Sequence, residues 1–104
     1  MKNEELIRTL NECAAHCNHC ADACLDEENV KMMVECIRLD RICATTCTAT
    51  AAALSVNSDE VRELAEACRK ICEKCANECA KHDAQHCQKC ADACKKCAEA
   101  CASY

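Results

Sequence analysis

Residues 87–101 of this chain read CQKCADACKKCAEAC, a stripe of cysteines at helical spacing. The five cysteines recur at steps of three and four residues, and the residues between them are small or charged. A helix with 3.6 residues per turn returns such steps to one face. This stretch therefore predicts a helix that presents thiols along the face where most helices present leucine.

The rest of the chain favours the same kind of structure. Its 104 residues contain no Gly and no Pro, which favours helices and argues against hairpins and Gly-rich phosphate loops. Residues 13–24 and 68–79 both carry four cysteines at steps of four, three and four. Residues 36–47 carry three more on one helical face, with Asp40 where another cysteine would fit the spacing. The chain has no Phe and no Trp, so its sixteen cysteines, which are small and often buried, must supply much of the core.

Cap and turn signals divide the chain into four helical segments. Asn3 and Asp26 are expected to cap the first two, and Asn57 with Glu60 resembles a capping box before the third, with Ser58 as an alternative cap. Short connections make consecutive helices antiparallel neighbours. We therefore predict an all-α, antiparallel up-down-up-down four-helix bundle with a cysteine-lined core, a single domain over residues 1–104, with helices at about 3–25, 27–55, 58–81 and 83–103.

The antiparallel order predicts a bundle with two unlike ends. Apolar residues gather at one end as a hydrophobic plug, namely Leu6, Ile7, Leu10, Leu54, Val56, Val61, Leu64 and Tyr104. Sulfur and imidazole groups gather at the other end, namely Cys24, Met32, Met33, Cys79, His82, His86 and Cys87. No leucine layer closes this second end, so soft metal donors are concentrated there.

Thiols three or four residues apart on a helix are placed to share a metal ion. Their Cβ atoms are about 5–6 Å apart, and a zinc–thiolate bond is about 2.3 Å long, so each Cys-x-x-x-Cys pair is a two-sulfur chelate. Two-sulfur sites suit Cu(I), a soft ion that prefers thiolates, whereas zinc prefers four ligands in a tetrahedron. A zinc or mixed-metal thiolate buffer and a disulfide-stapled structural bundle remain open as alternatives.

The sequence resembles the bacterial cysteine-rich copper storage proteins over almost the whole chain. The resemblance rests on the inward cysteine phase of four helices and on seven pairs: Cys13/Cys17, Cys20/Cys24, Cys43/Cys47, Cys68/Cys72, Cys75/Cys79, Cys90/Cys94 and Cys97/Cys101. It implies a four-helix bundle that stores multiple Cu(I) ions in its core. The implied metal ligands are all the cysteines: Cys13, Cys17, Cys20, Cys24, Cys36, Cys43, Cys47, Cys68, Cys72, Cys75, Cys79, Cys87, Cys90, Cys94, Cys97 and Cys101.

The resemblance also implies where ions are admitted and how the chain assembles. Members of the family are thought to take up ions at one open end with the help of His and Met, which by position are Met32, Met33, His82 and His86 here. A homo-oligomer, tetramer or dimer, is implied as well. Val30, Val34 and Ile37 lie off the cysteine face at helical spacing and are expected to supply its interface.

Several other function classes have little support in the sequence. A net charge of -5 gives no reason to expect nucleic acid or an anionic membrane as partner. No stretch has the apolar run of a signal peptide or a membrane span, so we expect a cytoplasmic protein with reduced thiols. No Ser-His-Asp or paired-carboxylate arrangement stands out, and we do not expect an enzyme. His16, His19 and Asp40 are expected to reach water.

Overall fold

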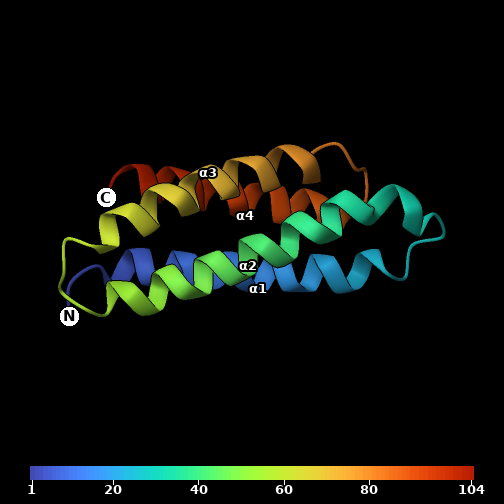
Figure 1. Ribbon diagram of the computed structural model, residues 1–104. Helices are drawn as coiled ribbons and strands as arrows, with labels where there is room; N and C mark the ends of the chain where they lie inside the picture. Colours follow the sequence, from blue (N-terminus) through green and yellow to red (C-terminus); the bar gives the residue numbers. More distant parts are fainter.

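Four long helices lie side by side along one axis in the computed structural model, which describes residues 1–104 (Figure 1). Both termini lie at one end of the bundle, together with the connection between the second and third helices. The molecule measures 45 × 18 × 18 Å. This arrangement confirms the predicted all-α, up-down-up-down bundle. The helices are α1 (Glu4–Cys24), α2 (Val34–Leu54), α3 (Val61–Cys79) and α4 (Gln85–Ala102), and a 3-10 turn, η1 (Val30–Met33), precedes α2.

The prediction that the second helix starts at residue 27 under an Asp26 cap was wrong. The backbone amides of Leu25, Asp26 and Glu27 donate to the carbonyls of residues 22–24 at 3.1–3.3 Å, so these residues continue the end of α1 as turns. The chain then passes through η1, and α2 begins only at Val34. The acidic cluster that resembled a helix start is therefore the connection between two helices.

The other predicted caps also differ in detail. Asn3 does precede α1, with φ of 63°, but its side chain forms no capping hydrogen bond. The third helix starts at Val61, three residues later than expected, with Glu60 at its N-cap and no side-chain cap hydrogen bond, so both the Asn57 capping box and the Ser58 cap are wrong. The backbone amide of Glu60 does donate to the Ser58 hydroxyl at 3.2 Å, in the turn before the helix. The fourth helix starts at Gln85, two residues later than expected, because Ala84 has an extended ψ of 138°.

The core of the bundle is a column of thiols. All sixteen cysteines are buried, and they join one apolar cluster with a few leucines, alanines and Met33. Because cysteine is small, the four helices can pack closely around this column, with only 18 Å across the molecule in the two short directions. The side chains that line the core therefore carry metal-binding groups along most of its length.

The plug at the end that holds the termini is smaller than the sequence predicted. Leu6, Leu10, Leu54 and Val61 are buried there, as expected. Two predicted members were wrong: Val56 follows α2 in a turn, and Leu64 lies on the outer side of α3, because Ala65 takes the inward position between Val61 and Cys68. No helix of the bundle has both the length and the apolar character that crossing a membrane requires.

Candidate metal centre

Pairs of cysteines one helical turn apart bring their sulfurs to a nearly constant separation. Two sulfurs bound at 2.3 Å to one ion are about 3.8 Å apart in a tetrahedron and about 4.6 Å apart when the ion lies midway between them. The observed Sγ–Sγ distance of 3.9 Å lies between these limits in five pairs: Cys20/Cys24, Cys43/Cys47, Cys68/Cys72, Cys75/Cys79 and Cys90/Cys94. Each of these pairs can thus accept an ion with small side-chain movements.

Sulfurs from different helices approach one another as closely as those within a helix. The Sγ atom of Cys94 lies 3.5 Å from that of Cys17 and 3.9 Å from that of Cys43. Groups of four whose sulfurs lie within 4.8 Å of one another include Cys13/Cys17/Cys43/Cys94, Cys13/Cys47/Cys72/Cys97 and Cys17/Cys75/Cys90/Cys94. Because these groups share members, the thiols form a continuous ligand network in place of separate four-cysteine cages.

Asp40 lies inside the thiol column, and the prediction that it would reach water was wrong. Its side chain is fully buried, with Oδ1 accepting from the thiols of Cys75, Cys79 and Cys90 at 3.2–3.3 Å. The position follows Cys36 by four residues and precedes Cys43 by three, so it keeps the inward phase of α2. Burial, and then the negative charge of neighbouring thiolates, raises the pKa of Asp40 to about 8.

At the end opposite the plug, His86 lies against two core thiols. Its Nδ1 atom is 3.4 Å from the Sγ atom of Cys20 and 3.5 Å from that of Cys87. Its Nε2 atom is 2.8 Å from a carboxylate oxygen of Glu27, which fixes the orientation of the ring. With Cys24, these residues form a group of three sulfurs and one nitrogen within 4.8 Å of one another.

The other residues expected at this end surround a surface cavity. Met32, Met33 and His82 line it together, with a volume of about 360 Å³. Met32 is exposed and Met33 is buried, and the His82 ring is 2.9 Å from the Glu78 carboxylate. The structure therefore brings these three together beside the end of the thiol column, whereas His86 lies in contact with the thiols themselves.

The comparison with protein families identifies this arrangement. The model of the copper storage protein family matches residues 1–104. The chain belongs to the copper storage protein family. The cysteine-lined four-helix bundle is thus the fold of that family.

Solved copper storage proteins share both the sequence and the shape of this chain. The Cu(I)-bound copper storage protein BsCsp3 is 43% identical, with a TM-score of 0.93 and coverage of 99% of this chain and 97% of that chain. The copper storage protein Ccsp from Streptomyces lividans, loaded with 10 copper equivalents, is 42% identical, with a TM-score of 0.92 and coverage of 95% and 80%.

A curated relative matches part of this chain. The uncharacterized cysteine-rich protein YhjQ of Bacillus subtilis (strain 168) is 44% identical over 66 residues, which are 64% of this chain and 61% of that protein. The match therefore spans less than two thirds of the curated relative. The similarity to the solved copper storage proteins covers far more of both chains.

The proton state of the thiol column is set by burial and by mutual hydrogen bonding. Burial raises the pKa of the Cys24 and Cys87 thiols, that of Cys87 to about 11. Hydrogen bonds from Cys20 and Cys79 lower the pKa of Cys36. A column of buried thiols cannot ionise as a whole without metal, because adjacent thiolates repel one another at low dielectric. A metal ion that binds these thiols must therefore displace protons.

Two glutamates that hold the histidines were missed in the sequence. Glu78 precedes His82 by four residues, so the contact between them follows helical spacing and was open to prediction. Glu27 and His86 are 59 residues apart in sequence. No sequence signal connects this second pair, because the contact depends on how the α1–η1 connection packs against the start of α4.

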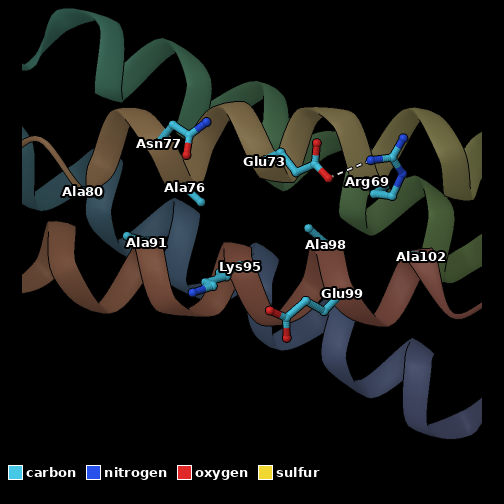
Figure 2. Close-up of a pocket in the computed structure, with 10 residues that line it drawn as sticks. All are labelled: Arg69, Glu73, Ala76, Asn77, Ala80, Ala91, Lys95, Ala98, Glu99 and Ala102. Carbon is cyan, nitrogen blue, oxygen red and sulfur yellow. Dashed lines mark hydrogen bonds and ion pairs between the residues drawn. The ribbon is translucent and has the colours of Figure 1, made fainter.

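One large surface cavity lies away from the thiols. It is a groove of about 650 Å³ between α3 and α4 (Figure 2). We call it the alanine groove, after Ala76, Ala80, Ala91, Ala98 and Ala102. Its charged lining residues are Arg69 and Glu73 on α3, joined at 2.7 Å, and Lys95 and Glu99 on α4. With neither sulfur nor imidazole in its lining, it has no soft metal donor.

Proposed function

We propose that this chain is a cytosolic store that sequesters many Cu(I) ions and buffers or detoxifies copper. The observation that carries the proposal is the continuous network of buried sulfurs, with neighbours 3.4–4.0 Å apart. All sixteen cysteines are proposed as ligands, and residues 1–104 as one storage unit. The solved relatives support this reading, since one is Cu(I)-bound and one is loaded with 10 copper equivalents.

The geometry favours Cu(I) over zinc as the stored ion. Structural zinc sites are closed sets of four ligands, whereas the groups of four sulfurs here share Cys13, Cys17 and Cys94. Thiolates that bridge several soft ions suit Cu(I), for which two or three sulfurs suffice. The alternative of a structural bundle held by disulfides is disfavoured too. All sixteen cysteines are free thiols, and a disulfide needs two sulfurs about 2.05 Å apart.

We propose the end opposite the plug as the mouth of the store. Met32, Met33 and His82 line a cavity there, and His86 touches the first thiols of the column. Thioether and imidazole are suitable transient ligands for Cu(I) on its way to thiolates.

The proposed role is binding without catalysis. A cytosolic location is supported by the relative from Streptomyces lividans, which is described as a cytosolic copper storage protein.

We also propose that the chain forms a homo-oligomer, a dimer or a tetramer. The expected interface around Val34 is limited, because Val30 and Ile37 are half-buried in their own bundle. The alanine groove is a better candidate, since both of its walls carry one positive and one negative residue. A second copy, turned about an axis along the groove, brings Glu73 opposite its Lys95 and Arg69 opposite its Glu99.

An anaerobic titration of fully reduced protein with Cu(I), against a competing chelator, tests storage directly. The expected result is tight uptake of many ions per chain, approaching the number of two-sulfur sites that sixteen cysteines can provide. Saturation at one to four ions would exclude storage and favour a regulatory or zinc-like site. Replacing Met32, Met33, His82 and His86 together is expected to slow loading with little loss of capacity.

A further inference from the structure

A second cavity reaches the thiol column from its side. It lies at the seam between α1 and α4, has a volume of about 270 Å³ and is lined by Cys13, together with Glu12 and His16 of α1 and Asp92 of α4. Fourteen of the sixteen cysteines have no exposed surface, whereas Cys13 keeps 1% and Cys101 keeps 5% at the plug end. Neither the groove between α3 and α4 nor the cavities beside His19 and beside Met32 include a core cysteine in their lining.

Cys13 is also a junction of the sulfur network. It belongs to two of the groups of four, one with Cys17, Cys43 and Cys94 and one with Cys47, Cys72 and Cys97. Its Sγ atom is 3.8 Å from that of Cys94. An ion bound at Cys13 can therefore pass to the sulfurs in the middle of the column by a single exchange of ligand. Cys24 at the mouth is eleven residues further along α1, which is about 16 Å of helix.

The rim of the cavity carries groups suited to holding an incoming ion. His16 follows Glu12 by one turn and Cys13 by three residues, so the three side chains share one side of α1. The His16 imidazole is exposed and makes no hydrogen bond within the protein, so a ring nitrogen is free to bind metal. Lys89 and Lys96 balance the charges of Glu12 and Asp92. The choice of metal ion therefore depends on the soft donors, which are the imidazole and the thiol.

We propose that this cavity is a lateral access site for Cu(I), at which His16 receives the ion and Cys13 draws it into the column. This inference rests on the proposed storage function. In the transfer, the bond from copper to His16 is replaced by a bond to the Cys13 sulfur. The thiol proton leaves to the Glu12 carboxylate and then to water, and the copper stays Cu(I) throughout.

The decisive experiment measures loading rates when the mouth is disabled. A parent variant, His82→Ala with His86→Ala, is mixed anaerobically with a Cu(I)–chelator complex, and the chelator absorbance is followed in time. Adding His16→Ala to this parent is expected to slow loading at least 5-fold. Adding His19→Ala, an exposed histidine of the same helix that does not line the cavity, is the matched control and should leave the rate unchanged. Equal rates for the two variants would overturn the proposal.

Two further measurements separate the lateral site from storage itself. Ala93→Leu, which fills the cavity from α4, is expected to slow loading of the same parent as His16→Ala does. In copper-free reduced protein, brief alkylation followed by peptide mass spectrometry should show that Cys13 is modified before Cys17. Cys17 lies one helical turn further along α1 and has no exposed surface. Modification of Cys17 first would contradict the proposed route. Failure of storage would appear instead as a low ion count at equilibrium in the unmodified protein.

Discussion

At the scale of single residues, Asp40 is the exception in the thiol column. It is a fully buried carboxyl that accepts hydrogen bonds from three thiols at 3.2–3.3 Å. Because burial raises its pKa to about 8, the copper-free protein at neutral pH keeps this group mostly protonated and uncharged. A neutral carboxyl accepts the hydrogen bonds of these thiols without placing a negative charge in the core, so its burial has a low electrostatic cost.

The pKa of Asp40 predicts how the stability of the copper-free protein depends on pH. The folded pKa of about 8 exceeds the ordinary value of 3.8, so the folded state binds more protons than the unfolded state between these values. The free energy of unfolding should therefore fall as pH rises from about 4 to about 8, by up to ~1.4 kcal/mol per pH unit from this group. Asp40→Asn should remove that part of the slope in reduced, copper-free protein, measured by urea unfolding across the pH range.

Asp22→Asn is the matched control for this prediction. Asp22 is an exposed aspartate of α1, so its replacement should leave the pH dependence of the free energy of unfolding as in the unmodified protein. If Asp40→Asn and Asp22→Asn gave the same pH dependence, Asp40 would not be titrating as a buried group.

The inward or outward position of a residue could be predicted where the helical period of the sequence determines it. Steps of three, four and, between Cys36 and Cys43, seven residues predicted all sixteen cysteines to face inward, because such steps return to one face of a helix. The same rule gave the phase of Asp40, yet it did not say that the site would be sealed. Whether a carboxyl on the inward face reaches water depends on how closely α3 and α4 cover it, and that depends on contacts distant in the sequence.

At the scale of elements, the plug stabilises α1 within the bundle. Leu10 belongs to this plug and is fully buried. Leu10→Ala should lower the free energy of unfolding by about 2–5 kcal/mol, because it removes buried methyl groups and leaves a cavity. Leu25→Ala, at the end of the same helix, should change it by about 0.5 kcal/mol or less, because that side chain is 57% exposed. Chemical unfolding under reducing conditions measures both, and equal effects would contradict the proposed plug.

Element boundaries were the part of the fold that the sequence predicted least well. The start of α2 was misplaced because Asp26 and the glutamates after it resemble a helix start, while their backbone amides are bound by the end of α1. Competition between two helices for one polar segment is decided by three-dimensional packing. The same connection carries Glu27 to His86, a contact that helical spacing could not reveal.

At the scale of the whole molecule, copper binding is expected to be coupled to folding. Ions that bind only the folded bundle raise its free energy of unfolding by about 2.7 kcal/mol per site when free ion is 100 times the dissociation constant. The thermal midpoint of reduced protein should therefore rise with each added equivalent of Cu(I), measured by anaerobic calorimetry. Chelator in excess should return it to the copper-free value. A midpoint that stays constant during uptake would mean that the ions bind outside the folded core.

Acid should release the stored copper. Each thiolate that binds an ion has lost a proton, so protons compete with Cu(I) for the same sulfurs. Lowering the pH of loaded protein is expected to transfer copper to a pH-insensitive chelator progressively, and restoring the pH should reverse the transfer. Retention of all copper at low pH would show that thiolates are not the main ligands.

Charge reversal in the alanine groove tests the proposed self-association. The two walls face each other in Figure 2, with Glu73 on α3 and Lys95 on α4. Lys95→Glu places two negative residues opposite each other in the proposed pair of chains, so sedimentation velocity should show a shift toward monomer. Combining it with Glu73→Lys should restore association, because the opposite charges are again paired. Lys74→Glu, on an exposed part of α3 outside the groove, has the same change in net charge and should leave the assembly intact. Monomeric unmodified protein, or equal effects of Lys74→Glu and Lys95→Glu, would rule out this groove as the interface.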